Sequence, residues 1–239
     1  IAGYETVLAG RMHFMGADQR HGYEKRLVGD ICRCYGGGPR TDFGKLSGAE
    51  SNGAKHRDLV GPGPNAVLDY DTAVTEAFEE FVNQRAESDE DRPLFTTVGW
   101  YGPHPPFACG TEYYEAAMQA VESGPEPVPK DEDPHPVVSG FLEKIRADRN
   151  TAEALLRARA NYAGMIHHMD DLIGRVLDAA EKLPGETLVI YSSDHGEMAG
   201  DHGMFGKGCF YDPSIKIPMI WAPLGERVSG MEMAAGAEI

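Results

Sequence analysis

The sequence predicts an α/β domain in which helices flank a mostly parallel sheet. The chain has 239 residues, 41% of them hydrophobic, so it is long enough to bury a substantial core. Three short runs with strand character, at residues 6–9, 94–100 and 187–191, each lead directly into a polar loop. A long helical pattern precedes the third run. This order of helix, turn, strand and loop is typical of a parallel sheet.

The first predicted strand is the β-prone run at residues 6–9, which ends at Gly10 and is followed by the polar side chains of Arg11 and His13. Further along, residues 32–65 are rich in Gly, Pro and Ser and show no sustained periodicity. We expect this segment to be an irregular loop excursion over the surface.

A helical pattern and then a second strand follow this excursion. Residues 73–81 carry apolar side chains at helical spacing, with Asp71 or Thr72 as the expected helix cap. The apolar, β-branched and aromatic run at residues 94–100 ends in a Gly-Pro-His-Pro-Pro sequence around His104. Because prolines restrict the backbone, this pattern predicts a buried strand that opens into a rigid loop.

The second half of the chain repeats this arrangement with a longer helix. Residues 123–136, rich in proline and acidic side chains, predict an exposed connection. From residue 151, apolar positions recur every three or four residues, which predicts a long amphipathic helix that ends at Pro184-Gly185. The buried strand candidate at residues 187–191 follows, and a last strand is expected around residues 219–221.

The composition excludes some classes of protein. With 22 Lys and Arg against 38 Asp and Glu, the formal net charge of −16 would repel nucleic acid and anionic lipid, and we interpret it as a solvated surface. No apolar run is long enough to span a bilayer. The four cysteines show neither a CxxC pair nor a metal-ligand spacing: Cys32, Cys34, Cys109 and Cys209.

The first residues, Ile-Ala-Gly-Tyr-Glu, do not look like a signal peptide and contain no initiating Met. We therefore expect a soluble piece of a larger domain, incomplete at both ends, whose targeting information lies outside it. The sequence leaves the compartment and the oligomeric state open.

Functional side chains follow each of the three predicted strands. Arg11 and His13 come after the first strand, His104 after the second, and Asp194 and His195 after the third. In open α/β sheets, ligands bind beyond the carboxyl ends of the strands. These loops are therefore expected to converge on one site, although they are far apart in the sequence.

Each candidate residue also has a purely structural interpretation. Asp194 and His195 could bind one divalent cation from two directions, or Asp194 could cap a turn while His195 lies in a surface loop. His104 could transfer a proton or bind an anion, or could belong to a rigid surface turn. Lys207 and Arg11 suit an anionic substrate, although a solvated cationic side chain is the more usual case.

The segment at residues 187–218, TLVIYSSDHGEMAGDHGMFGKGCFYDPSIKIP, resembles the C-terminal metal-and-lysine segment of the sulfatase family, in the alkaline-phosphatase superfamily. It contains an apolar strand, Ser-Asp-His-Gly-Glu, Gly-Asp-His, a Lys, Tyr-Asp and Lys-Ile-Pro, in that order. Chance would seldom supply this series.

Other stretches are similar to sulfatases as well. They are the helix at residues 161–175, the Pro-His-Pro-Pro-Phe ending of residues 94–107, and residues 10–14, which resemble a Gly-Lys-Trp/Met-His segment. Residues 18–23 resemble the choline-sulfatase-like branch. The resemblance implies an alkaline-phosphatase-like fold, with residues 1–239 forming part of a sulfatase catalytic domain.

The resemblance also implies a role for each candidate. Asp194 and His195 would be ligands of a divalent cation, commonly calcium. Lys207 would contact the sulfate and its bridging oxygen, and His104 would bind the sulfate or act as an acid near the leaving oxygen. His13 would assist the hydrate of the formylglycine nucleophile.

Arg11 stands where the family usually has Lys. A guanidinium can hold a sulfate in two places, but it does not readily release a proton. Arg11 is therefore expected to bind substrate rather than to transfer protons.

The Cys- or Ser-x-Pro-x-Arg motif that yields formylglycine, and the paired acids that complete the metal site, are not in this sequence. We expect both upstream, so this chain alone is expected to be inactive. The resemblance implies a metal-dependent sulfuric ester hydrolase that acts on a small-molecule or carbohydrate sulfate ester. The alternatives are a phosphonate or phosphate ester hydrolase of the same superfamily, and a catalytically silent sulfatase-like domain that binds an anionic glycan.

Overall fold

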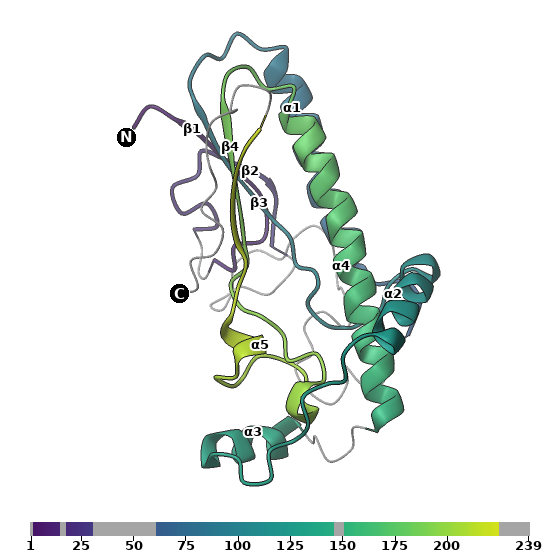
Figure 1. Ribbon diagram of the computed structural model, residues 1–239. Coiled ribbons are helices and arrows are strands. Elements are labelled where there is room, and N and C mark those ends of the chain that lie inside the picture. Colours follow the sequence, from purple (N-terminus) through teal and green to yellow (C-terminus); the bar gives the residue numbers. More distant parts are fainter. Residues whose placement is uncertain (1, 15–17, 31–60, 146–150, 225–239) are drawn as a thin grey trace.

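The structure of the protein, a computed structural model, shows strands on one side of two long helices (Figure 1). Most of the predicted loop excursion, including Cys32 and Cys34, lies outside the described residues. The described residues are 2–14, 18–30, 61–145 and 151–224.

Three parallel strands form one sheet. β1 (Glu5–Gly10) lies in the middle, between β2 (Lys25–Val28) and β3 (Leu94–Gly99). β1 and β3 pair without a shift up to Gly10 and Gly99, so these two strands end at the same edge. The strands predicted at residues 6–9 and 94–100 are therefore confirmed, but the expected burial of the second is wrong, because β3 is partly exposed along its length. β2, with only four residues, was not predicted.

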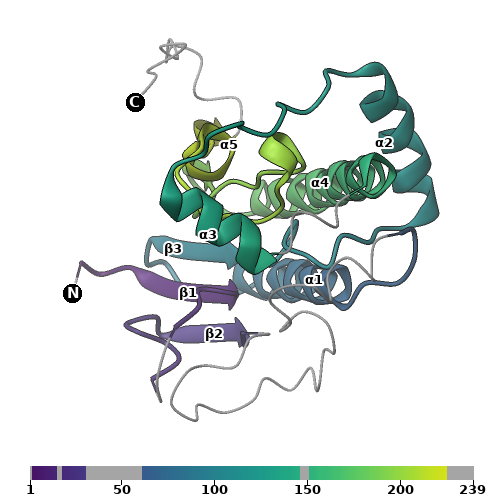
Figure 2. The ribbon, with the colours of Figure 1, turned by 90° about the horizontal axis from the view of Figure 1, so that it is seen from below.

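The helix α1 (Ala66–Ala86) packs against this sheet and against the long helix α4 (Ala152–Ala180) (Figure 2). α4 in turn packs against α2 (Thr111–Ser123). The inward side of α1 is a helical stripe of buried side chains, Val67, Tyr70, Val74, Phe78 and Val82, which join the buried strand residues in the main core.

The start of α1 differs from the prediction. The helix begins at Ala66, where Asn65 caps it by accepting a hydrogen bond from the Val67 backbone N–H at 3.0 Å. Asp71 and Thr72, the caps expected from the sequence, lie inside the helix. The sequence pattern misplaced the start because polar side chains interrupt the apolar spacing in the first two turns.

The short helix α5 (Asp212–Ile215) and two longer helices were not predicted. The two longer helices are α2 and α3 (Pro136–Ile145), and the connection at residues 123–136 runs between them, exposed at most of its positions. The predicted helix from residue 151 corresponds to α4, which Thr151 caps through a hydrogen bond from the Ala154 N–H.

The strand predicted at residues 187–191 is β4 (Thr187–Ser192), but its expected burial and its expected parallel pairing are both wrong. β4 pairs antiparallel with β5 (Met219–Leu224), and the two form a separate sheet. The parallel character of the fold therefore belongs to β1, β2 and β3. Between β4 and β5 lie a 3₁₀ turn at Asp201–Gly203 and the short helix α5 (Asp212–Ile215).

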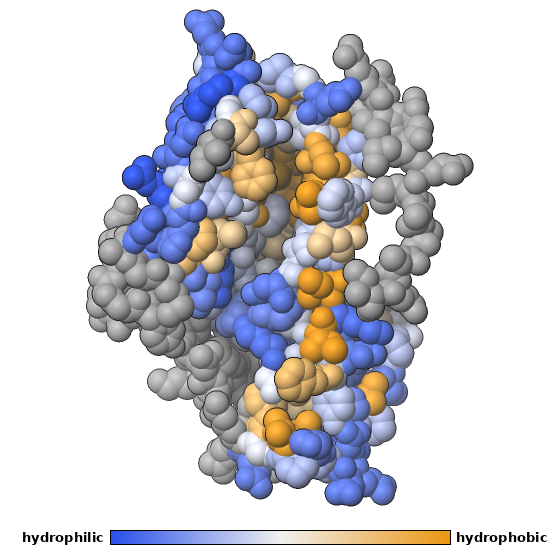
Figure 3. Space-filling model, turned by 90° about the vertical axis from the view of Figure 1, so that its left-hand side faces the viewer, coloured by the Kyte–Doolittle hydropathy of each residue, from blue (hydrophilic) through white to orange (hydrophobic). Residues whose placement is uncertain are grey.

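One apolar face of the β4–β5 sheet is not covered by the described residues. Leu188 and Ile190 alternate with half-buried residues on β4, Ile190 is paired with Trp221 on β5, and all three side chains are about half exposed. Figure 3 shows apolar side chains gathered in a stripe on this side of the molecule. No described helix is long and apolar enough to cross a membrane.

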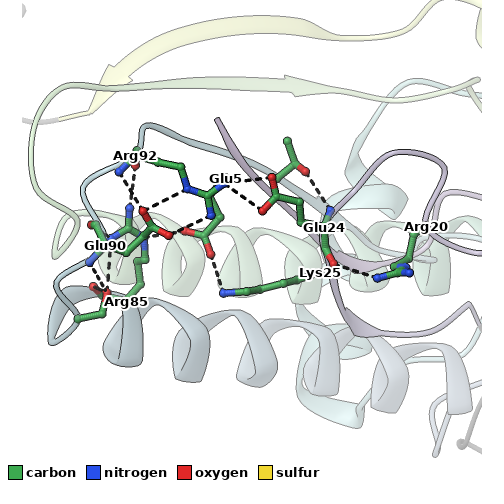
Figure 4. A network of polar contacts seen from close by, with 9 residues as sticks. Glu5, Arg20, Glu24, Lys25, Arg85, Glu90 and Arg92 are labelled. Atoms are coloured by element: carbon green, nitrogen blue, oxygen red, sulfur yellow. Dashed lines mark hydrogen bonds and ion pairs between the residues drawn. The ribbon is translucent and has the colours of Figure 1, made fainter. Parts of the chain in front are cut away.

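Charged side chains form a network at the amino end of the parallel sheet (Figure 4). Glu5 on β1 is fully buried and accepts a hydrogen bond from Lys25 Nζ at 2.7 Å. Arg85 on α1 forms an ion pair with it, and Arg85 Nε lies 2.8 Å from Glu5 Oε2. The Nε–H does not point at this oxygen well enough for a hydrogen bond. Toward solvent, Arg92 pairs with Glu24 and Glu90.

Candidate functional site

The loop after β1 carries Arg11 and His13 at the carboxyl end of the sheet. The Arg11 backbone N–H continues the pairing with β3 by donating to Gly99 O at 2.7 Å. The Arg11 guanidinium lies 3.9 Å from the ring centroid of Tyr101, so its planar face stacks on the aromatic ring. This contact uses the geometry that distinguishes Arg from Lys.

His13 has a left-handed backbone, with φ of 53°. Its backbone N–H donates to the carboxylate of Asp30 at 2.8 Å, just beyond the end of β2. His13 is thus held on the β2 side of the sheet edge, and its exposed side chain is carried by a constrained turn.

The loop after β3 places His104 close to Tyr101. The His104 N–H donates to Tyr101 O at 3.2 Å, and the two rings lie 4.5 Å apart. His104 Nδ1 lies 2.8 Å from Pro105 O. A carbonyl only accepts, so Nδ1 carries a proton and Nε2 is the ring nitrogen that can exchange one. Arg11 and His104 are therefore brought together around one Tyr101 side chain.

The first two turns of α1 hold both ends of the His104 loop. Asp71 accepts hydrogen bonds from the Tyr101 N–H at 2.6 Å and the Gly102 N–H at 2.7 Å. Asn65 donates to Pro106 O and Ala108 O at 3.0 and 2.8 Å. The sequence analysis missed both roles.

A local signal for Asp71 did exist. It lies four residues after Val67 and three before Val74, so it occupies the buried stripe of α1. A carboxylate at such a position needs hydrogen-bond partners. The local sequence does not show which backbone groups are these partners, because they lie about 30 residues away.

The loop after β4 brings Asp194 and His195 together. His195 Nδ1 lies 2.8 Å from Gly196 O and therefore carries a proton. His195 Nε2 lies 3.5 Å from Asp194 Oδ1. In a neutral imidazole this nitrogen has a lone pair, so two electron-pair donors face each other. A cation shared by both atoms would suit this geometry.

Glu197 organises the rest of this loop, and no role was predicted for it. Its carboxylate accepts hydrogen bonds from the Ala199 N–H at 3.2 Å and from the Gly206 N–H, which precedes Lys207. Burial raises the pKa of Glu197, while these hydrogen bonds and the charges of Lys207 and His195 lower it; the net shift is upward. The Glu197 carboxylate thus interacts electrostatically with both His195 and Lys207.

Aromatic contacts join the two groups of candidates. Phe107, at the end of the His104 loop, lies 5.6 Å from the ring of Phe205, two residues before Lys207. It also makes an edge contact at 5.6 Å with Tyr162 of α4. Phe107 and Phe205 therefore link the loop that carries His104 to the segment that carries Lys207.

The fit to a metal ion is partial. Asp194 is 79% exposed and His195 34%, so both side chains are accessible to a ligand. Among the described residues there is no group of three or more His, Cys, Asp or Glu that could hold a metal. Asp194 and His195 are thus only two candidate ligands, whereas a hard cation such as calcium takes six to eight oxygen atoms.

Comparison with known proteins identifies the family. The model of the family named Sulfatase matches residues 1–232. Choline-sulfatase of Rhizobium meliloti is 29% identical over 94% of this chain and 46% of its own length. The multifunctional alkaline phosphatase superfamily protein PehA of Trinickia caryophylli is 32% identical over 57% of this chain and 30% of its own.

Solved structures agree in fold. The phosphonate monoester hydrolase of Agrobacterium radiobacter covers 92% of this chain and 50% of its own, with a TM-score of 0.59 and 23% identity. A 2-O GAG sulfatase, BT1596, covers 92% with a TM-score of 0.56 and 20% identity. The chain spans about half the length of these proteins, and their fold is the predicted alkaline-phosphatase-like one.

Proposed function

Because this chain belongs to the sulfatase family, we propose that the complete protein containing it is a metal-dependent sulfuric ester hydrolase. The observation that carries this proposal is a chain of contacts that joins the loops after β1 and β3 to the segment before Lys207. Tyr101 joins Arg11 to His104, and Phe107 joins the His104 loop to that of Lys207. A solvated, unrelated set of polar residues would not need these contacts.

Arg11 and Lys207 supply positive charge for an anionic substrate in a chain whose net charge is −16. The Arg11 guanidinium, oriented by its stacking on Tyr101, binds sulfate oxygens through its planar array of N–H donors. Lys207 is exposed and stabilises charge that develops on the sulfate and on the leaving oxygen.

His104 acts as the proton donor to the leaving group. Its Nδ1–H is engaged with Pro105 O, so in the imidazolium form Nε2 delivers its proton to the leaving oxygen as the sulfur–oxygen bond breaks, and the neutral imidazole remains. His13 follows Arg11 in the loop after β1 and assists the nucleophile. The formylglycine residue expected outside this chain would supply the nucleophilic oxygen.

Asp194 and His195 would hold a divalent cation, which we propose to be calcium. The facing of His195 Nε2 and Asp194 Oδ1 at 3.5 Å supports their role as two of its ligands. When bound, such an ion would supply neutralisation of charge on the sulfate oxygens and on the nucleophile. The remaining ligands would come from the paired acids expected outside this chain.

A phosphonate or phosphate ester hydrolase is the second candidate. The observation that favours it is the likeness in fold to the phosphonate monoester hydrolase of Agrobacterium radiobacter, together with the match to PehA, a multifunctional protein of the alkaline phosphatase superfamily. The residues described here bind tetrahedral anions in general, and similar sites serve both kinds of transfer.

The test compares substrates on the purified complete protein. Choline sulfate and an aryl sulfate represent sulfate esters, and an aryl phosphonate monoester represents the second candidate. We expect kcat/KM to be higher for a sulfate ester, and mass spectrometry to detect formylglycine. A higher kcat/KM for the phosphonate would favour the second candidate, and no hydrolysis of any of them, with calcium supplied, would contradict both.

A further inference from the structure

Asp71 occupies an unusual place for a carboxylate. It is fully buried in α1, on a stripe that also contains the apolar Val67, Val74 and Phe78. Burial raises the pKa of Asp71 to about 7, although its hydrogen bonds and the charge of Arg11 act in the opposite direction. The two carboxylate oxygens therefore need strong partners in this position.

Those partners are backbone groups of the His104 loop. β3 ends at Gly99, and the N–H groups of Tyr101 and Gly102 donate to Asp71 Oδ1 and Oδ2 at 2.6 and 2.7 Å. Each carboxylate oxygen thus takes one N–H just beyond the strand. The contact fixes the direction in which the chain leaves the sheet.

The packing around Gly102 shows how closely this contact is fitted. A Cβ added at Gly102 would lie 2.6 Å from Asp71 Oδ2, nearer than real Cβ atoms approach. Glycine is therefore required if the carboxylate is to reach the loop backbone. The contact therefore depends both on the carboxylate of Asp71 and on the absence of a side chain at Gly102.

The loop held in this way carries His104. The His104 N–H donates to Tyr101 O at 3.2 Å, and its ring lies 4.5 Å from that of Tyr101. A shift of Tyr101 would therefore move the imidazole. Asn65 holds the end of the loop at Pro106 and Ala108, and Asp71 holds the end that leaves β3, at Tyr101 and Gly102.

We propose that Asp71 is a positioning residue that places the His104 imidazole for catalysis by fixing the backbone of Tyr101 and Gly102. This inference rests on the proposed function for its catalytic consequence, although the positioning itself is a structural property. Asp71 touches neither substrate nor the reacting atoms in this role.

The first test measures kcat/KM of the complete protein for a sulfate ester. Asp71→Asn is made in two backgrounds, one with His104 intact and one with His104→Ala. Asn replaces one acceptor oxygen by an NH₂ donor that faces a backbone N–H. We expect a loss of roughly 10-fold or more with His104 intact, and of less than about twofold without it. Equal losses in both backgrounds, or a loss below twofold with His104 intact, would overturn the inference.

Thr75→Val is the matched control. Thr75 is also buried in α1, and its hydroxyl accepts a hydrogen bond from Trp100 Nε1 at 3.0 Å. Trp100 directly precedes Tyr101, which Asp71 contacts. We expect this variant to lower the melting temperature but to leave kcat/KM within about twofold. A loss as large as that of Asp71→Asn would show that any buried lesion in α1 disturbs the site, and would overturn a specific role of Asp71.

Gly102→Ala disturbs the same contact from the loop side. It serves where Asp71→Asn does not yield folded protein, since it leaves the carboxylate and the helix unchanged. The same pattern is expected: a loss of roughly 10-fold or more that depends on His104. A kcat/KM within twofold of the unaltered protein would contradict the inference.

A second readout does not depend on catalysis. NMR of histidine-labelled protein reports the ring protons of His104, which lie in the ring-current field of Tyr101. Asp71→Asn should move the His104 signals and leave those of the exposed His135 in place. Unmoved His104 signals would overturn the positioning role. Failure of the unaltered protein to hydrolyse sulfate esters would instead overturn the proposed function, and the histidine spectra would still decide this inference.

Discussion

Glu5 and Asp71 are both fully buried carboxylates, and they lie at opposite ends of the parallel sheet. Glu5, at the amino end, is surrounded by side-chain cations, with Arg85 and Lys25 within 2.8 Å. Asp71, at the carboxyl end, is surrounded by the backbone N–H groups of Tyr101 and Gly102. The same helix, α1, therefore reaches both ends of the sheet but uses its polar residues differently at each.

This difference indicates that the buried charges at the amino end of the sheet stabilise the fold, whereas those at the carboxyl end serve the proposed site. At the amino end the charges neutralise one another and tie α1 to β1 and β2, so they hold the fold together. At the carboxyl end a buried carboxylate shapes a loop backbone, while Asp194 and Lys207 present exposed side chains. Substitutions at the two ends should consequently be read by different measurements, the unfolding free energy at one and turnover or metal affinity at the other.

The largest effect is expected for Glu5→Ala. Removing this carboxylate leaves the buried Arg85 guanidinium without its counter-charge, and breaking a buried pair in this way typically costs about 3–5 kcal/mol. Denaturant unfolding of the complete protein measures this loss. A loss below about 1 kcal/mol would mean that Glu5 is not a structural anchor and that the comparison fails at the amino end.

Lys207→Ala should lower turnover of a sulfate ester by roughly 10²-fold, the scale expected when one contact to the transition state is removed. Lys216→Ala is the control, because Lys216 is an exposed lysine of the same segment, paired with Asp212. We expect its turnover within about twofold of the unaltered protein. Near-normal hydrolysis by Lys207→Ala at saturating calcium would remove Lys207 from the proposed site.

Asp194→Ala should weaken metal binding along with turnover, because a carboxylate ligand holds the ion before any chemistry occurs. We expect calcium affinity, measured by calorimetry on the complete protein, to fall about 10- to 100-fold. Asp212→Ala, which removes an exposed carboxylate of the same segment, should leave calcium affinity unchanged. Equal affinities for Asp194→Ala and the unaltered protein would exclude Asp194 as a ligand.

The smallest effect is expected for Lys25→Ala, which sharpens the comparison within the amino-end network. The Lys25 side chain is 55% exposed, so solvent screens its ion pair with Glu5. When Lys25 is removed, water can take its place at Glu5 Oε1. A loss of at most about 1 kcal/mol in the unfolding free energy is expected. A loss as large as that of Glu5→Ala would show that both cations, and not Arg85 alone, are needed to keep Glu5 buried.

Local pattern accounted for the elements that pack most regularly. The runs at residues 94–100 and 187–191 and the spacing from residue 151 correspond to β3, β4 and α4. β2 and α2 were not predicted, since four strand residues and a helix with Ala117 as its buried residue carry little periodic signal. The first turns of α1 were missed because polar side chains interrupt their apolar spacing, and one of these, Asp71, is buried against the backbone of Tyr101 and Gly102.

The sequence by itself determined which residues could carry the chemistry and that they follow strands, because motif order and strand endings are written along the chain. Only the tertiary structure decided what holds them. The stacking of Arg11 on Tyr101 and the clamp of Asp71 on Gly102 join residues 30 to 90 positions apart. The antiparallel pairing of β4 with β5 is likewise decided by contacts across more than 25 residues. Such contacts depend on which surfaces meet when the chain is packed, and periodicity along the chain does not record that.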